Sequence, residues 1–230
     1  MNKRIIVSAT FVVIVIVVIV SFASYQANLL EMHDRDRYME NIIAAQQSSL
    51  LNLENGSPPL GSESAPITIV KFGDYQCEAC YHWFHNTRST VIDNYIETGK
   101  AKLVFMDLPF LGRDSPKAAQ ASYCAEDQEK YWEYHTILYT FQDGPPDSGW
   151  ADRDRLNSFA FSLDMNMDEF NECMDSSKYK QRVKANYDEA VKNDANSTPT
   201  FIIISQDGKI EKFAGAQPYS VFAATIESML

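Results

Sequence analysis

The chain has 230 residues, of which 45% are hydrophobic and 12% aromatic. This is enough for one well-cored domain with accessory segments, too little for two large domains, and too apolar for a disordered polyanion. The formal net charge is −11, and no cluster of Lys and Arg follows the first few residues. Because phosphate binding requires a basic face, the composition argues against a nucleic-acid partner.

The amino terminus has the pattern of a membrane anchor. Lys3 and Arg4 precede an uncharged run, rich in Val and Ile, over residues 5–23. A membrane span needs roughly 20 apolar residues, whereas the core of a signal peptide has about 7–15. No basic excess follows the run, so the two basic residues would stay in the cytoplasm and the rest would be exported. We expect an uncleaved transmembrane helix within residues 1–27. Cleavage after Ser21-Phe22-Ala23, which has small residues at its first and third positions, is the alternative and would release a secreted protein.

A stalk and linker are predicted next, over residues 28–63. Residues 28–50 have an amphipathic helical pattern, and residues 55–63 are rich in Gly, Ser and Pro, which interrupt regular structure. The pattern then changes to strands and helices, so the folded domain is predicted over residues 64–230.

The predicted elements of this domain follow in the order strand, helix, strand, a block of helices, hairpin and helix. β-branched runs bounded by Pro or Gly predict the strands, and apolar side chains at helical spacing predict the helices. Strands are expected at 67–72, 102–108, 200–204 and 210–213, and helices at 80–97, 115–141, 152–163, 167–176, 178–194 and 219–230. This order predicts an α/β fold with a helical insertion at about 115–195 between its two halves.

Cys77 and Cys80 form the motif that carries chemistry. They lie where the first strand ends and a helix begins. The N–H groups and the dipole of a helix N-terminus favour a thiolate, which is the nucleophilic form of cysteine. At this spacing the first sulfur can form a mixed disulfide that the second resolves. A zinc site completed by His82 and His85, or an inert disulfide, is the alternative.

The other two cysteines, Cys124 and Cys173, fall in the predicted insertion. Disulfides persist in exported proteins, and Cys77 and Cys80 are too close together to staple the fold, which leaves Cys124 to pair with Cys173. A structural bridge that closes a loop of about 50 residues would stabilise the fold by roughly 4 kcal/mol in the chain-entropy model. Two buried free thiols and a second redox relay are the alternatives.

Several segments, taken in order, are similar to parts of one family. They include FGDYQCEAC at 72–80 and TPTF at 198–201, with further matches at 59–70, 125–135, 173–176 and 215–218. Together they resemble the DsbA-like thioredoxin-fold family of thiol–disulfide oxidoreductases. The resemblance extends over residues 59–230 and implies a thioredoxin fold with an inserted helical subdomain. It also implies exported protein substrates, no metal, and no cofactor beyond the protein's own sulfurs.

The resemblance assigns roles by position. Cys77 would attack, Cys80 would resolve, and Pro199 would be a cis-proline facing them, preceded by Thr198. The backbone of Thr198 would then pair with an extended substrate strand. An ordinary proline at the start of a strand is the alternative for Pro199. A membrane quinone-linked partner of the DsbB or VKOR type would reoxidise the cysteines.

Two positions depart from the family. Lys71 stands where relatives carry a buried acid that is thought to shuttle the proton of the resolving thiol. A lysine there would either be neutral through desolvation or favour thiolates. Glu78 lies between the cysteines, where strongly oxidising relatives place a histidine. If ionised, Glu78 would raise the thiolate pKa and make the disulfide less oxidising. His82, just after Cys80, is a third candidate for redox tuning.

The sequence therefore predicts an extracytoplasmic enzyme that introduces disulfides into exported proteins and is tethered by one N-terminal helix. A reductase or isomerase of the same fold is the alternative within this class. A metal-handling Cys/His module and a non-catalytic scaffold are the alternatives outside it.

Overall fold

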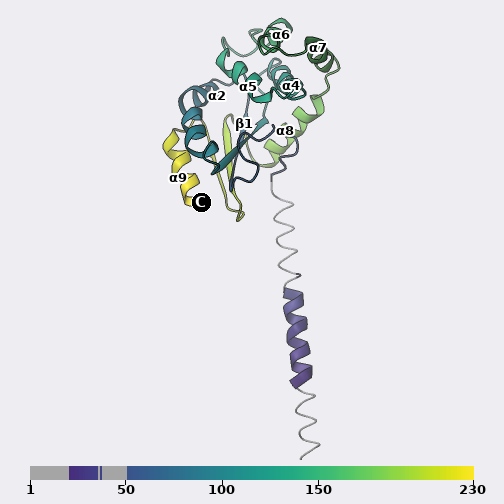
Figure 1. The fold of residues 1–230 in the computed structure, drawn as a ribbon, viewed down its shortest axis with the longest axis vertical. Helices are drawn as coiled ribbons and strands as arrows, with labels where there is room; N and C mark the ends of the chain where they lie inside the picture. Colours follow the sequence, from purple (N-terminus) through teal and green to yellow (C-terminus); the bar gives the residue numbers. More distant parts are fainter. Residues whose placement is uncertain (1–20, 36, 38–50) are drawn as a thin grey trace, which may run out of the picture. The chain divides into compact units, whose positions relative to one another are not determined.

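The computed structural model describes residues 21–35, 37 and 51–230. The chain divides into two compact units, Met1–Leu51 and Asn52–Leu230. In the first unit, residues 21–35 form a helix whose side chains are exposed (Figure 1). Most of the transmembrane run predicted at residues 5–23 lies outside the described residues. No helix within the described ranges combines the length and the hydrophobicity needed to cross a membrane.

The second unit is built on a four-stranded sheet in the order β2-β1-β3-β4 (Figure 1). β1 (Ile67–Gly73) pairs in parallel with β2 (Ala101–Asp107) and antiparallel with β3 (Thr200–Ser205), which pairs antiparallel with β4 (Ile210–Ala214). All of the predicted strands are therefore confirmed. The parallel pair requires a crossover connection, and the helical stretch between β1 and β2 supplies it.

That stretch is helical without interruption. It consists of α2 (Glu78–Trp83), η1 (Phe84–Arg88), α3 (Ser89–Val91) and η2 (Ile92–Ile96), where η1 and η2 are π-helical. Together with α9 (Tyr219–Met229) it packs against one face of the sheet. Ile67, Trp83 and Phe222 meet in this apolar layer. The layer fixes the start of α2, and hence Cys77, relative to the ends of β1 and β3.

The insertion contains the helices α4 to α8, which follow β2. Their bounds are α4 (Ser115–Glu126), α5 (Tyr131–Thr140), α6 (Arg153–Ser162), α7 (Met167–Asp175) and α8 (Lys180–Lys192). The single helix expected at 115–141 is wrong, because the chain turns between α4 and α5. There Glu129 has a φ of +59°, and the N–H of Lys130 returns to the carbonyl of Ala125 at 2.9 Å. The apolar spacing continues through the turn, so periodicity alone did not reveal it.

Residues 52–63, assigned to the linker from their composition, lie in the second unit. The N–H of Ser57 donates to the carbonyl of Phe105 at 2.8 Å, and the Ser57 hydroxyl accepts from the N–H of Phe105 at 2.9 Å. Leu60 forms an antiparallel bridge with Leu103. Because β2 supplies these hydrogen bonds, the compact unit begins well before residue 64.

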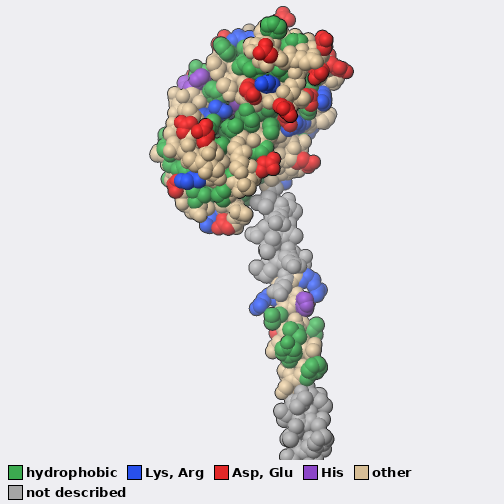
Figure 2. All heavy atoms as spheres, in the orientation of Figure 1, with side chains coloured by type: hydrophobic (Ala, Val, Ile, Leu, Met, Phe, Trp, Pro, Cys, Tyr) green, Lys and Arg blue, Asp and Glu red, His purple; other side chains and the backbone are tan. Residues whose placement is uncertain are grey.

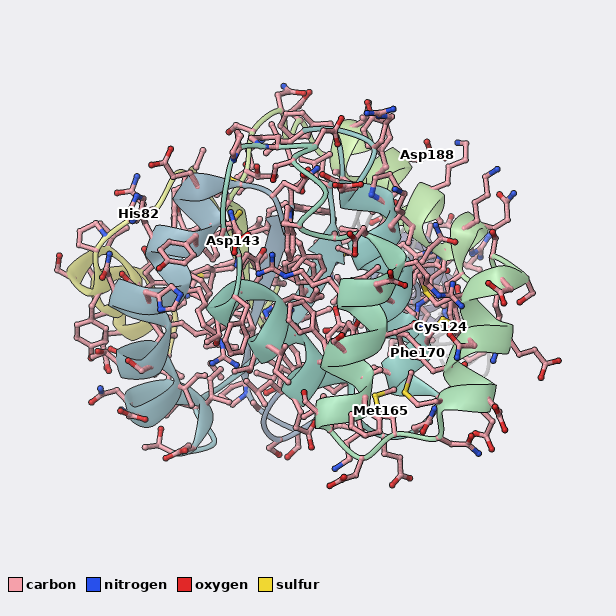
Figure 3. The ribbon with its side chains drawn as sticks, turned by 90° about the horizontal axis from the view of Figure 1, so that it is seen from above. His82, Cys124, Asp143, Met165, Phe170 and Asp188 are labelled. Atoms are coloured by element: carbon pink, nitrogen blue, oxygen red, sulfur yellow. A yellow bond between two sulfur atoms is a disulfide. The ribbon has the colours of Figure 1, made fainter. Side chains whose placement is uncertain are left out.

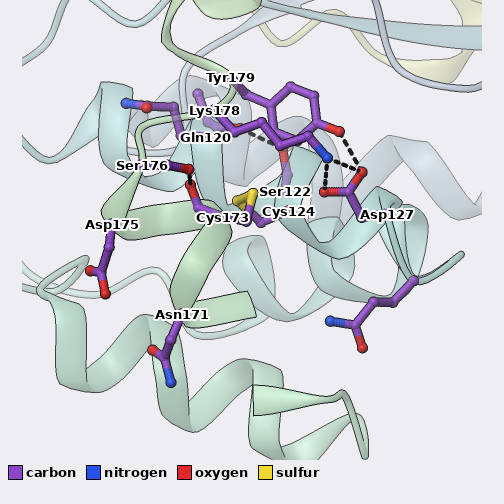
Figure 4. Close-up of a disulfide and its surroundings, with 12 residues drawn as sticks. Gln120, Ser122, Cys124, Asp127, Asn171, Cys173, Asp175, Ser176, Lys178 and Tyr179 are labelled. Carbon is purple, nitrogen blue, oxygen red and sulfur yellow. Dashed lines mark hydrogen bonds and ion pairs between the residues drawn. A yellow bond between two sulfur atoms is a disulfide. The ribbon is translucent and has the colours of Figure 1, made fainter. Parts of the chain in front are cut away.

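Cys124 on α4 and Cys173 on α7 form a disulfide (Figure 4). Both residues are buried, and they belong to the apolar core of the insertion with Met165 and Phe170 (Figure 3). The bridge ties together two helices that are 49 residues apart in sequence at this point.

The surface beside the disulfide is acidic. Asp127, Glu169 and Glu172 line a cavity of about 430 Å³ next to Cys173. Lys178 also lines it and pairs with Asp127 at 2.8 Å, so the two glutamates leave the net charge negative. Figure 2 shows acidic side chains gathered over the end of the domain that α6 and α7 form. Negative charge there repels an incoming thiolate, the species that opens a disulfide. The setting therefore suits a bridge that persists.

The double substitution Cys124→Ala/Cys173→Ala is expected to lower the free energy of unfolding by up to roughly 4 kcal/mol, the loop-closure contribution of the chain-entropy model. Urea unfolding in a Cys77→Ser/Cys80→Ser background measures this effect without interference from the other thiols. In the background that retains Cys77 and Cys80, disulfide exchange should continue. Loss of turnover by a folded double variant would instead support the relay.

Candidate functional site

Cys77 caps the N-terminus of α2. Its backbone is extended, and its Sγ accepts a hydrogen bond from the N–H of Cys80 at 3.3 Å. Both residues are free thiols, and both are buried, Cys77 at 6% exposure and Cys80 at 0%. The strand-to-helix junction predicted from the sequence therefore places the sulfur of Cys77 at a helix terminus, where negative charge is favoured.

The two cysteines have opposite acidities. The hydrogen bond from the Cys80 thiol is the main reason that the pKa of Cys77 falls from 9.0 to about 6, despite the opposing effect of burial. Burial is the main reason that the pKa of Cys80 rises well above 9.0. At neutral pH, Cys77 is therefore a thiolate and Cys80 a thiol. The first is prepared to attack or leave, and the second holds its proton.

A loop from the far end of the chain faces Cys77. The Thr198–Pro199 peptide bond is cis, and the carbonyl oxygen of Thr198 lies 3.2 Å from Cys77 Sγ. The N–H of Gly215 donates to the carbonyl of Pro199 at 2.8 Å and anchors the loop at the start of β3. The fold thus brings together Cys77, Thr198 and Pro199, which the sequence had grouped.

Lys71 lies in the centre of β1 and is 1% exposed. Within the part of the chain that the structure describes, its Nζ has no hydrogen-bond partner. The amine instead lies 4.4 Å from the ring centroid of Tyr139, 4.6 Å from that of Trp83 and 5.3 Å from that of Phe105. Desolvation lowers its pKa from 10.5 to about 8, and the negative charge that Cys80 can carry opposes this shift.

Glu78 and His82 lie on the outer side of α2. Their side chains are 90% and 54% exposed, and His82 Nε2 is 3.6 Å from Glu78 Oε1. Figure 3 shows His82 at the periphery of the domain. Water screens exposed charges of this kind, so each acts only weakly on the buried sulfurs.

A groove of about 710 Å³ opens beside Cys77. Tyr81 and Leu111 provide apolar walls, and the loop between α5 and α6 provides the opposite side through residues 142–146. The sequence did not reveal the role of this loop, because Gly144, Pro145 and Pro146 indicate only the end of a helix. The groove can accommodate an extended polypeptide that brings a sulfur to Cys77.

His82 and His85, the candidate zinc ligands, have other partners: His82 lies beside Glu78, and His85 lies beside the backbone of Tyr139. His85 Nε2 lies 3.2 Å from the carbonyl oxygen of Tyr139. Among residues 21–35, 37 and 51–230, no group of three or more His, Cys, Asp or Glu side chains is arranged to hold a metal ion. The geometry at Cys77 is instead that of a helix-terminal thiolate opposite a backbone carbonyl.

Comparison with known proteins gives a consistent result. A family model described as thioredoxin matches residues 54–228. Disulfide bond formation protein D of Bacillus subtilis is 30% identical over 180 residues, which cover 76% of this chain and 78% of that protein. The solved structure of Wolbachia pipientis alpha-DsbA1 is 26% identical with a TM-score of 0.71, covering 80% of this chain and 95% of that one. The structure of oxidised BdbD from Bacillus subtilis is 26% identical with a TM-score of 0.69, covering 77% and 94%.

Cys77 is expected to react with iodoacetamide with a pH midpoint near its pKa of about 6 rather than 9.0. Because the thiol of Cys80 is the main cause, Cys80→Ala should move that midpoint upward. The pH dependence of alkylation, read by mass spectrometry of the Cys77 peptide, measures both. A midpoint near 9 in the wild-type protein would contradict the thiolate assignment.

Proposed function

This chain belongs to the thioredoxin family, in its DsbA-like branch, and is a thiol–disulfide oxidoreductase; we propose that it introduces disulfides into exported proteins through Cys77 and Cys80. The observation that supports this direction is the opposite shift of the two thiol pKa values. A stable Cys77 thiolate favours the reduced pair, so the Cys77–Cys80 disulfide tends to oxidise its substrates.

The proposed reaction begins with the disulfide form. A substrate thiolate attacks Cys77 Sγ, the Cys77–Cys80 bond breaks, and Cys80 leaves as a thiolate that takes up a proton. The second substrate thiolate then attacks the substrate sulfur bound to Cys77, and Cys77 leaves as a thiolate. The substrate loses two electrons and gains a disulfide, and its thiol protons pass to Cys80 and to solvent. The reduced pair retains the two electrons.

In this proposal Thr198 and Pro199 present backbone to the substrate. The Thr198 carbonyl already lies beside Cys77 Sγ. An extended segment that pairs with this backbone would carry its cysteine to the reacting sulfur, as in other cases of strand addition.

The remaining assignments concern location and reoxidation. We propose that residues 1–27 anchor the protein in a membrane, that residues 28–63 provide a stalk whose last part packs on β2, and that residues 64–230 work outside the cytoplasm. A membrane quinone-linked partner of the DsbB or VKOR type would accept the two electrons. The similarity to a disulfide bond formation protein and to a DsbA structure supports the location outside the cytoplasm. The reoxidising partner is implied by the family resemblance alone.

Lys71 has a tuning role in this proposal. The positive charge of Lys71 lowers the pKa of Cys80. Lys71 also occupies the sequence position at which relatives carry the buried acid. At neutral pH Lys71, with a pKa of about 8, is mostly an ammonium, and its charge stabilises the thiolate that Cys80 becomes when it loses its proton during reoxidation. Glu78 and His82 would adjust the same field from the surface, with smaller effects.

Cys80→Ala is expected to trap substrates, because the mixed disulfide on Cys77 then has no resolving thiol. Non-reducing gels of extracytoplasmic extracts should show covalent adducts that dithiothreitol releases. Cys77→Ser should form none and should lose oxidation of a reduced protein substrate. Activity that survives Cys77→Ser would point to a scaffold, and a redox potential close to that of thioredoxin would favour a reductase.

Lys71→Met is expected to raise the free energy of unfolding at pH 7 by about 1 kcal/mol, because a buried ammonium without a partner is replaced by an apolar chain of similar length. Between pH 8 and 10.5 the unfolded chain binds more protons at Lys71 than the folded chain does, since the folded pKa is about 8. The wild type should therefore gain stability relative to the variant as the pH rises through this window. Urea unfolding at several pH values tests this, with the exposed Lys100→Met as control. A pH-independent difference would contradict it.

A further inference from the structure

Gln76, the residue before Cys77, has a buried and almost fully hydrogen-bonded side chain. It is 4% exposed. Its Nε2 donates to Ser115 Oγ at 2.8 Å, while its Oε1 accepts from the N–H of Asp147 at 2.7 Å and from Trp150 Nε1 at 3.2 Å. Both lone pairs of the amide oxygen are thus used, and both bonds go to the loop between α5 and α6.

That loop forms one side of the groove beside Cys77. We call residues 142–150 the groove wall, because residues 142–146 line the groove and the remainder joins them to α6. Asp143, labelled in Figure 3, is an exposed residue of this loop. The wall has no regular secondary structure of its own, so its position depends on contacts with the rest of the domain.

Arg155 on α6 pairs with Asp143, and the Trp150 ring is buried in the apolar core. Two further sets of hydrogen bonds hold the wall from the side of the groove. In one, Asp147 Oδ1 accepts from the N–H of Asp114 at 3.0 Å, and Asp114 Oδ2 accepts from the N–H of Gly149 at 3.2 Å. This pair connects the wall to the start of α4. In the other, the Gln76 amide connects the wall to the segment that carries Cys77.

Gln76 itself is fixed at the backbone. Its N–H donates to Asp74 Oδ1 at 2.8 Å, and Asp74 Oδ2 accepts from the N–H of Leu111 on the opposite side of the groove at 3.0 Å. The short turn at residues 74–77 therefore fixes the positions of Cys77 and Leu111. Through Gln76 it also fixes the position of the groove wall. The N–H of Asp147 and the indole N–H of Trp150 both donate to the same oxygen atom, Gln76 Oε1. Only a side chain with an acceptor oxygen at this position can satisfy both donors.

We propose that Gln76 is a positioning residue that holds the groove wall at the distance from Cys77 that a polypeptide substrate requires. The inference rests on the proposed function and adds a determinant of substrate class. An extended peptide contacts the wall, whereas a small dithiol reaches Cys77 without it. Loss of the Gln76 amide should therefore weaken peptide binding and leave the chemistry of the sulfurs unchanged.

The test compares Gln76→Met with wild type in the oxidation of a short reduced peptide that contains two cysteines, and of dithiothreitol. A fixed concentration of oxidised glutathione regenerates the Cys77–Cys80 disulfide and is itself reduced to two glutathione thiols. Methionine keeps the length of the side chain and removes its hydrogen bonds. The KM for the peptide is expected to rise by about tenfold. The kcat for the peptide, the rate with dithiothreitol and the iodoacetamide pH midpoint of Cys77 are expected to stay at wild-type values.

Two further variants isolate the role of the amide oxygen. Gln76→Glu keeps an acceptor for Asp147 and Trp150, so it should restore a peptide KM close to that of the wild type. Gln120→Met makes the same chemical change on α4, where the amide bonds only to Pro116 of its own helix, and should leave all values unchanged. If Gln76→Met does not fold, Trp150→Phe removes one of the bonds from the wall side, and a raised peptide KM is again expected.

The outcomes separate the two proposals. An unchanged peptide KM in folded Gln76→Met, or an equal loss of rate with peptide and dithiothreitol, would overturn the positioning role while leaving the oxidase intact. A wild-type protein that oxidises neither substrate would overturn the proposed function itself. A selective rise of the peptide KM that Gln76→Glu reverses supports the inference.

Discussion

The interaction on which the site depends is the contact between the Cys77 sulfur and the first turn of α2. The N–H of Cys80 points at that sulfur, and the Cys80 thiol adds a second hydrogen bond, so negative charge is stable there. A sheet in the order β2-β1-β3-β4 is needed to hold this turn opposite the Thr198 carbonyl. The sheet and α2 together therefore hold the Cys77 sulfur in the position where its negative charge is stable.

The surroundings of that sulfur divide into a chemical side and a recognition side. Beneath it, Lys71 is packed among aromatic rings, where its charge affects both thiols and is sensitive to pH. Beside it, the groove wall is held by Gln76 and by the Asp114–Asp147 contacts. In the roles proposed above, the first side tunes the acidity of the thiols and the second selects the substrate.

The sequence was informative where the signal is local. Each strand, the helix start at Cys77 and the pairing of Cys124 with Cys173 follow from short patterns and spacing. It failed where contacts between distant residues decide the structure. The turn after α4 interrupts no periodic pattern. The groove wall donates hydrogen bonds to Gln76 from residues 71 and 74 positions away. For Lys71, the sequence offered two electrostatic outcomes, and only the folded structure shows that the amine is fully buried, so that desolvation lowers its pKa to about 8.

The bridge between Leu60 and Leu103 has a consequence for a protein that works among unfolded chains. It covers the free edge of β2, where a reduced, unfolded client could otherwise add a strand and aggregate. The opposite edge, β4, carries Glu211 and Lys212, and such charges discourage the same event. Strand addition is thereby disfavoured at both edges of the sheet, which agrees with the proposal that a substrate pairs at the cis-proline loop.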